Sequence, residues 1–266
     1  MQSIRFSSAS VTRWLFIALG VLLVLHLFVA FGHLVLHIRL EAMTQLVDLD
    51  LEANLPTLFN VLLFVMGSAL FLLHGKAAEP KARRGWFVMA GVFLFLSLDE
   101  GSQIHEKFML ITLKLMNHGS TSGHFGWLYQ AWVIPYGLAI IVLGLVLLRW
   151  FLRLPPKLQR GLFISGCVYV FGAVFLEMAG GKVIESLTLP IKPPSLYPWM
   201  PCEVYPDPFY CWIYMEPRYI ALYTMEEMGE MTGLIMCIRV LLKAFETKRM
   251  EVRLSLSELD ADTSAV

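Results

Sequence analysis

Acidic and histidine side chains interrupt segments of this chain that are otherwise apolar, and they define the chemistry that the chain could carry. The stretch LSLDEGSQIHEKF, residues 96–108, directly follows an apolar run. Further carboxylates interrupt later apolar segments at residue 177 and at residues 226–230. Ionisable groups are costly inside a membrane helix and usually face the interior of a helix bundle. We therefore treat these residues as a candidate site.

The residue types indicate metal chemistry with acid–base support. Imidazole and carboxylate ligands suit iron, zinc or manganese, and the set contains none of the thiolates that softer metals prefer. The predicted metal ligands are His33, His37, Asp99, Glu106, Glu177, Glu226 and Glu230. The predicted catalytic residues, which would move protons, are Glu100, Glu227 and His105. In ligand inventory alone the set is similar to di-metal carboxylate bundles, although the Glu-x-x-His pairs of those bundles do not occur here.

Helical spacing predicts which of these side chains can meet. On an ideal helix Asp99 and Glu106 share one face, whereas Glu100 and His105 flank that face on opposite sides. Only one of the two flanking residues is therefore expected to join the site. His33 and His37 are spaced one helical turn apart, which suits two ligands of one metal ion.

The elements that must position these residues are membrane-spanning helices. The 266 residues are 57% hydrophobic and only 16% charged, with a mean hydropathy of +0.64. With about 20 apolar residues per crossing, the pattern predicts an all-α, polytopic membrane protein. Its six predicted transmembrane helices cover residues 14–38, 55–74, 86–108, 127–152, 161–187 and 218–243.

The distribution of basic residues predicts the orientation. Lys and Arg cluster before the first span, after the second, after the fourth and after the sixth. These segments lie on one side in a six-span topology, and the positive-inside rule makes that side cytoplasmic. Both termini are then cytoplasmic, as in a protein of a bacterial inner membrane. Residues 1–243 form one transmembrane domain, and residues 244–266 form a polar cytoplasmic tail.

Nine of the ten candidate residues then fall in the extracytoplasmic half of the bilayer, although they come from four different helices: His33, His37, Asp99, Glu100, Glu106, Glu177, Glu226, Glu227 and Glu230. This coincidence of depth predicts one shared polar site that opens to the extracytoplasmic side. The long segment 189–217, rich in Pro, Tyr and Trp, is expected to cover it. Cys202 and Cys211 within that segment are expected to form a disulfide, because the compartment is oxidising.

These observations favour a metal-dependent membrane enzyme that acts on a lipid or other amphipathic substrate, by hydrolysis or by oxidation. A cation or proton-coupled transporter is an alternative, since acidic residues also build ion pathways. A structural or haem-binding subunit of a larger membrane complex is a third reading. Membrane lipids are the expected partners, and the formal net charge of zero gives no indication of nucleic-acid binding.

Overall fold

The computed structural model describes residues 7–38, 40–118, 125–188 and 216–248, and within these ranges the chain is entirely helical, without strands. The all-α prediction is therefore confirmed. The α-helices are α1 (Ser8–Leu34), α2 (Glu41–Val47), α3 (Leu55–Lys76), α4 (Pro80–Ser102), α5 (Ile104–Met116), α6 (Val133–Phe151), α7 (Pro156–Val170), α8 (Glu177–Thr188) and α10 (Pro217–Lys248). A 3₁₀ turn, η1 (Gly126–Leu128), precedes α6, and a π-helical segment, η2 (Phe171–Leu176), joins α7 to α8.

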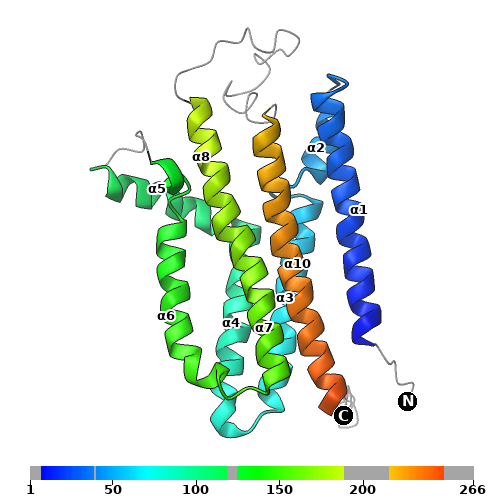
Figure 1. Ribbon diagram of the computed structural model, residues 1–266, viewed down its shortest axis with the longest axis vertical. Helices are drawn as coiled ribbons and strands as arrows, with labels where there is room; N and C mark the ends of the chain where they lie inside the picture. The colour runs from blue at the N-terminus through cyan, green and yellow to red at the C-terminus, as the bar shows by residue number, and fades with distance from the viewer. Residues whose placement is uncertain (1–6, 39, 119–124, 189–215, 249–266) are drawn as a thin grey trace, which may run out of the picture.

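The long helices run side by side, with α10 in the middle of the bundle (Figure 1). α10 contacts α1, α3, α7, η2 and α8, and α3 packs along α4. The core between them is aromatic and aliphatic, with Phe64 and Phe71 of α3 and Ile235 and Ile238 of α10 almost completely buried. α6 stands at one edge of the bundle (Figure 1). The central position of α10 means that its polar residues must face other helices.

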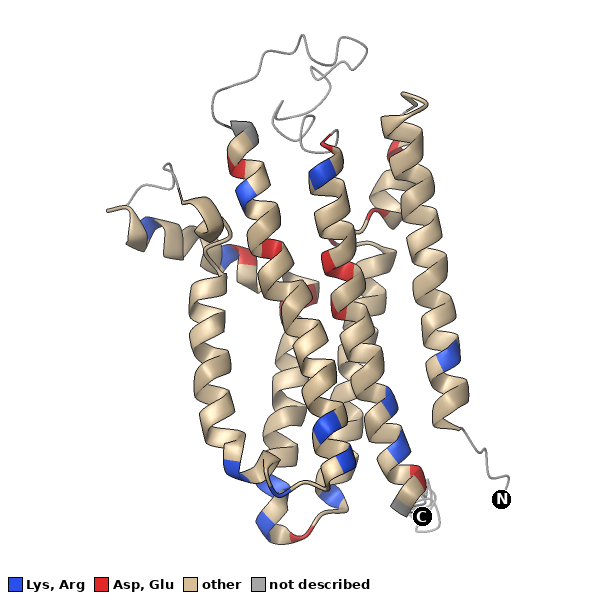
Figure 2. Cartoon of the chain, in the orientation of Figure 1, with Lys and Arg blue, Asp and Glu red and all other residues tan. Residues whose placement is uncertain are grey.

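Most of the described Lys and Arg residues lie at one end of the bundle, here called the basic end, around residues 76–84, 149–160 and 239–248 (Figure 2). The first residue of α1 and the last turns of α10 meet at this end, where the Ser8 hydroxyl donates a 2.7 Å hydrogen bond to Oε2 of Glu246. The beginning of α1 and the end of α10 therefore share one end of the molecule.

Four helices are long and apolar enough to cross a membrane: α1, α3, α6 and the continuous helix Pro156–Ser186. The bent pair α4 and α5 would make a fifth span if counted together. α10 covers the predicted sixth span, but three carboxylates in its middle reduce its apolar character. Large apolar side chains such as Leu145 and Val146, each 69% exposed, cover the outer face of α6. These features are compatible with an integral membrane protein.

The predicted span 86–108 is not one helix. α4 ends at Ser102, Gln103 adopts a left-handed conformation with φ 54° and ψ 43°, and α5 then leaves at 81° to α4. Oδ1 of Asp99 accepts a 2.8 Å hydrogen bond from the backbone N–H of His105, which satisfies one of the free donors in the first turn of α5. A left-handed residue cannot continue a right-handed helix, so the chain turns at this elbow.

The predicted first span also ends early, because α1 stops at Leu34 and His37 has a φ of 55°. α6 begins at Val133, six residues later than predicted, because η1 and a turn precede it. Cys202, Cys211 and most of the predicted cover segment, residues 189–217, lie outside the described residues. The predicted disulfide therefore remains a prediction.

The elbow leads to a first test. A left-handed conformation costs an L-residue about 1–2 kcal/mol, and a β-branched side chain tolerates it worst. Gln103→Ile should therefore lower the melting temperature of the purified protein in detergent, whereas Gln103→Gly should leave it unchanged or raise it. The opposite order of the two variants would contradict a left-handed elbow at this residue.

Candidate functional site

A cavity of about 820 Å³ lies among α3, α4, α5, α6, α7, α8 and α10. Its most unusual feature is its charge, because its described lining holds nine carboxylates and neither Lys nor Arg. The nine are Asp50, Glu52, Asp99, Glu100, Glu106, Glu177, Glu226, Glu227 and Glu230. In Figure 2 most acidic residues of the bundle lie well away from the basic end. One acidic site, built by several helices, is thus the main polar feature of the interior.

The structure brings eight of the ten predicted site residues to this cavity: Asp99, Glu100, His105, Glu106, Glu177, Glu226, Glu227 and Glu230. Glu100 and His105 both line it, although an ideal helix would allow only one of them to do so. The expectation failed because it assumed an unbroken helix. The elbow at Gln103 lies between the two residues and turns α5 back toward the same space.

His33 and His37 are not brought to the cavity. Nε2 of His33 lies 3.2 Å from the Thr44 hydroxyl of α2. His37 follows the end of α1 and is not helical. The predicted arrangement of these two histidines, one turn apart on a single helix face, therefore does not form.

The contact between η2 and α10 positions the acidic residues of α10. A Cβ atom at Gly172 would lie 2.7 Å from the backbone oxygen of Glu226 and 3.0 Å from the backbone nitrogen of Glu230. Only glycine permits this approach, since real Cβ contacts are almost never so short. The π-helical segment directly precedes Glu177 at the start of α8. Glu226 and Glu230 are consequently buried against the helix that carries Glu177.

Glu177 and Glu226 form a direct contact between two acidic side chains in the site. Their side chains lie within hydrogen-bonding reach of each other. Oε1 of Glu177 also accepts a 3.3 Å hydrogen bond from the indole N–H of Trp132. Two carboxylates at such a distance cannot both stay ionised without a counterion. The pair must therefore share a proton or a cation.

Asp50 and Glu52 were not predicted as site residues. They lie on the segment between α2 and α3, which reads DLDLEAN over residues 48–54. Its charged residues alternate with apolar ones, which is the pattern of an extended segment with one polar side. That alternation could have identified Asp50 and Glu52 as candidate site residues. The two residues were missed because the segment lies outside the long apolar runs.

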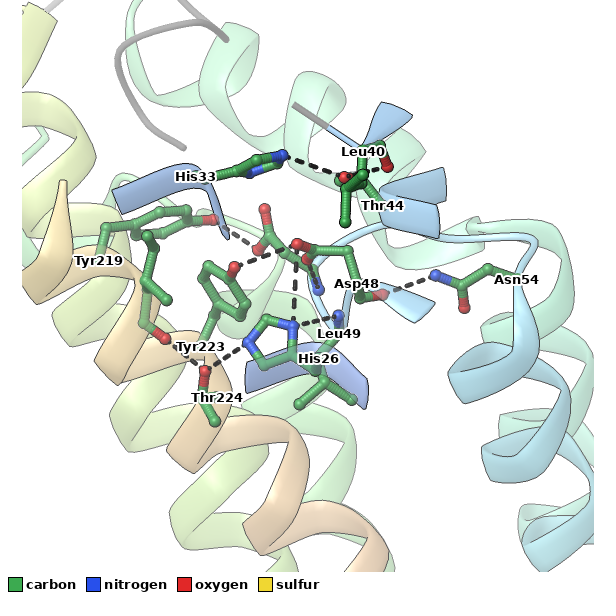
Figure 3. A network of polar contacts seen from close by, with 12 residues as sticks. His26, His33, Leu40, Thr44, Asp48, Leu49, Asn54, Tyr219, Tyr223 and Thr224 are labelled. Atoms are coloured by element: carbon green, nitrogen blue, oxygen red, sulfur yellow. Dashed lines mark hydrogen bonds and ion pairs between the residues drawn. The ribbon is translucent and has the colours of Figure 1, made fainter. Parts of the chain in front are cut away.

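Hydrogen bonds from its own residues and from α10 hold this segment in the bundle (Figure 3). The Asn54 amide donates to the backbone oxygen of Asp48 at 2.6 Å, and its oxygen caps α3 by accepting from the N–H of Thr57. From α10, Tyr219 donates a 2.7 Å hydrogen bond to Oδ1 of Asp50, and Tyr223 donates a 3.4 Å bond to Oδ2 of Asp48. The position of Asp50 in the cavity is thereby fixed.

His26 of α1 completes this network (Figure 3). It is fully buried, and its Nδ1 accepts from the backbone N–H of Leu49 at 3.3 Å. Its Nε2 must then carry the hydrogen of a neutral ring and donate to the Thr224 hydroxyl at 3.0 Å. That hydroxyl in turn donates to the backbone oxygen of Ile220 at 2.6 Å. His26 therefore links α1, the 48–54 segment and α10.

His105 is the only cavity-lining side chain in the described chain that could carry a positive charge near neutral pH. Its Nδ1 lies 3.4 Å from Oδ1 of Asp99, and its Nε2 lies 3.7 Å from Oε1 of Glu52. The ring thus bridges the acidic segment and the end of α4. One imidazolium cannot balance nine carboxylates, so most of them have no positively charged side chain to oppose them.

Three polar groups at the site make no close hydrogen bond among the described residues, although each has polar side chains nearby. The Asn60 amide is fully buried outside the cavity lining, with Glu100 and Glu230 as its polar neighbours. The Tyr136 hydroxyl and Oε2 of Glu52 are on the cavity lining, with Asp99 and Gln103 as their polar neighbours. Buried polar groups are nearly always paired in native proteins, so the Tyr136 hydroxyl and Oε2 of Glu52 are the two of these groups that suit a ligand in the cavity.

The carboxylates do not form a closed metal site. Within the described ranges, no three His, Cys, Asp or Glu side chains are arranged to hold a metal ion. Two carboxyl groups at the edge of the site, those of Asp50 and Glu52, instead have raised pKa values. Burial raises the pKa of Asp50 to about 7, and nearby Asp48, Glu177 and Glu106 add to this effect against the lowering hydrogen bond from Tyr219. Burial and then Glu106 raise the pKa of Glu52 to about 7.

Comparison with known proteins places the chain by family alone. A family model described as a domain of unknown function, DUF8692, matches residues 14–245. No curated protein and no solved structure matches the chain.

The raised pKa values predict how stability depends on pH. Burial raises the pKa of Asp48 to about 6 and that of Asp50 to about 7, from about 3.9 in an unfolded chain. Between the unfolded and the folded pKa values, the folded state binds more protons than the unfolded chain does. The free energy of unfolding therefore falls as pH rises from about 4 to about 7. With a chelator present, the melting temperature should be higher at pH 5 than at pH 8.

Asp50→Asn should make this dependence shallower, because the amide is neutral at every pH. Glu79→Gln, at an exposed carboxylate of the basic end, is the matched control and should leave the slope unchanged. A melting temperature that rises between pH 5 and pH 8 would contradict the raised values.

Proposed function

We propose that the chain, which belongs to the DUF8692 family, is a membrane-embedded, metal-dependent enzyme that acts on a lipid or other amphipathic substrate. The observation that carries the proposal is the composition of the cavity. Nine carboxylates and one histidine line one part of it, and apolar side chains of α4, α6 and α7 line the rest. A cation is the natural partner of the first part, and a hydrocarbon chain is the natural partner of the second.

The proposal includes six membrane crossings with both termini in the cytoplasm. α1 begins and α10 ends at the basic end, so an even number of crossings separates them. In the six-crossing topology α4 and α5 count as one span with an elbow, and α10 is the sixth span. The positive-inside rule then places the basic end in the cytoplasm, as in a bacterial inner membrane. The acidic cavity consequently faces the extracytoplasmic half of the bilayer.

Glu177, Glu226 and Glu230 are the proposed ligands of a divalent cation such as iron, zinc or manganese. Glu177 and Glu226 already face each other, and Glu230 lies one turn from Glu226 on the same helix. Without a cation these side chains repel one another, and a cation would draw them together by rotation about side-chain bonds. Asp99 and Glu106 of the elbow complete the proposed ligand set from the opposite wall.

The chemistry that such a site supports is activation of bound water. A divalent cation lowers the pKa of a water ligand, and a nearby carboxylate can accept its proton. Glu100 and Glu227 line the same space and are the proposed general bases. His105, held by Asp99 and Glu52, would return a proton to a leaving group. Hydrolysis is the reaction that these groups perform with the fewest additional components.

A cation transporter would require polar groups that continue toward the basic end. The described interior below Glu230 instead holds no buried carboxylate: Met231, Ile235, Ile238 and Leu241 of α10 are fully buried there, with isolated polar groups such as His74 and Ser165. Phe64 and Phe71 of α3 fill the space beside them. This packing favours a site that opens toward one side over a pathway across the membrane.

Metal content provides the test. Wild-type protein, purified in detergent after growth with iron, zinc and manganese, should contain at least about one equivalent of metal by mass spectrometry. Glu226→Gln and Glu230→Gln should each weaken Mn²⁺ binding by roughly tenfold or more, because the loss of even an outer-shell partner has such an effect. Glu79→Gln should bind as wild type does.

Wild-type protein that takes up no stoichiometric metal from any of the three ions would refute the metal proposal. Cation flux into liposomes that disappears with Glu230→Gln would instead support the transporter.

A further inference from the structure

The cavity consists of two chemically different parts. Its acidic part lies between the 48–54 segment, the elbow and the middle of α10. Its other part, here called the apolar arm, is lined by Val92 and Leu96 of α4, Ala139 and Leu143 of α6, and Val170 and Val174 of α7 and η2. The two parts belong to one continuous space of about 820 Å³, which is within the range of ordinary ligand sites. A ligand that fills the space must be polar at one end and apolar at the other.

The position of α6 provides access for such a ligand. α6 stands at the edge of the bundle and makes few contacts with α4 and α5 (Figure 1). Its outer face is apolar, with Leu138 63% exposed. Ala139, the next residue, lines the apolar arm from the same helix. The apolar arm and the apolar outer face are thus separated by a single helix, which favours entry of a hydrocarbon chain from the bilayer side.

The charge of the acidic part selects the polar end of the ligand. Nine carboxylates face a single histidine, without Lys or Arg among the described lining residues. With all nine ionised, even two divalent cations and a protonated His105 would balance only five of them, so protons or further cations must supply the rest. An anionic headgroup, such as a phosphate or a carboxylate, would add to the excess, whereas a cationic group would reduce it.

The unpaired polar atoms point to the same class of headgroup. The carboxylate oxygen Oε2 of Glu52 accepts hydrogen bonds, and the Tyr136 hydroxyl can accept one. An ammonium group is a donor with three hydrogens and no acceptor, so it suits these groups better than an anion does.

We propose that the cavity binds a single-chain lipid with a protonated amine head, which places the amine among the carboxylates and the hydrocarbon chain in the apolar arm. The proposal rests on the proposed function for the identity of the cavity as a substrate site, but not on the presence of a metal. It names the substrate class of that enzyme as single-chain lipids that carry both a free amine and a bond that water can cleave, such as an ester, and a simple long-chain amine serves as the probe of binding.

The test compares amphiphiles that differ only in their headgroups. Hexadecylamine, hexadecanol and hexadecanoic acid are titrated into wild-type protein in phosphatidylcholine nanodiscs at pH 7, and binding is followed by the fluorescence of Trp132 and the other tryptophans. The amine should bind at least tenfold more tightly than the acid, with the alcohol between them. Glu226→Gln together with Glu227→Gln should reduce the preference for the amine over the acid at least threefold.

Ala139→Trp fills the apolar arm and should weaken hexadecylamine binding at least tenfold. Leu138→Trp, on the lipid-facing side of the same helix, is the control and should bind as wild type does. Leu143→Phe is a second variant that fills the arm, should Ala139→Trp not fold. Metal content is measured in the same samples, so that a failure of amine binding is distinguished from a failure of the metal site.

Equal or tighter binding of the acid would overturn the proposed headgroup. Unchanged amine binding in a folded arm-filling variant would overturn the proposed position of the chain.

Discussion

The structure depends on the burial of like charges in one cavity without basic side chains to balance them. Carboxylates are stable in an apolar interior only when they are paired, protonated or bound to a cation. Here they come from the 48–54 segment, α4, α5, α8 and α10, and a single histidine is the only described lining residue that could oppose them. The contact between Glu177 and Glu226 makes the constraint explicit. The interior therefore requires a positive partner, and the metal and amine proposals both follow from that requirement.

Two irregular segments make the convergence of charges possible. Non-helical backbone at membrane depth is tolerated only where it is buried in protein or lines a cavity. The 48–54 segment meets this condition through bonds to His26, Asn54, Tyr219 and Tyr223. The elbow at Gln103 meets it through the bond from the backbone of His105 to Asp99. Asp99 thus both lines the site and holds the turn that brings His105 to it.

The sequence alone predicted the helical class and most of the acidic residues of the cavity, because both are encoded in strong patterns. Long apolar runs identified the helices, and the shared depth of Asp99, Glu177 and Glu230 indicated one site. The elbow was not predicted, because Gln103 itself is neither glycine nor proline and the preceding Gly101 and Ser102 stand alone within a pattern that otherwise continues as a helix. His33 and His37 were misplaced for a related reason, because the apolar pattern continues beyond the true end of α1.

The most direct test of the central claim is the location of a cation within the acidic cavity. Crystals of the protein grown with Mn²⁺ should give an anomalous diffraction peak at the manganese edge among Glu177, Glu226 and Glu230. The account predicts such a peak and its loss in crystals of Glu226→Gln. Well-ordered carboxylates without any anomalous peak, at a saturating concentration of Mn²⁺, would contradict it.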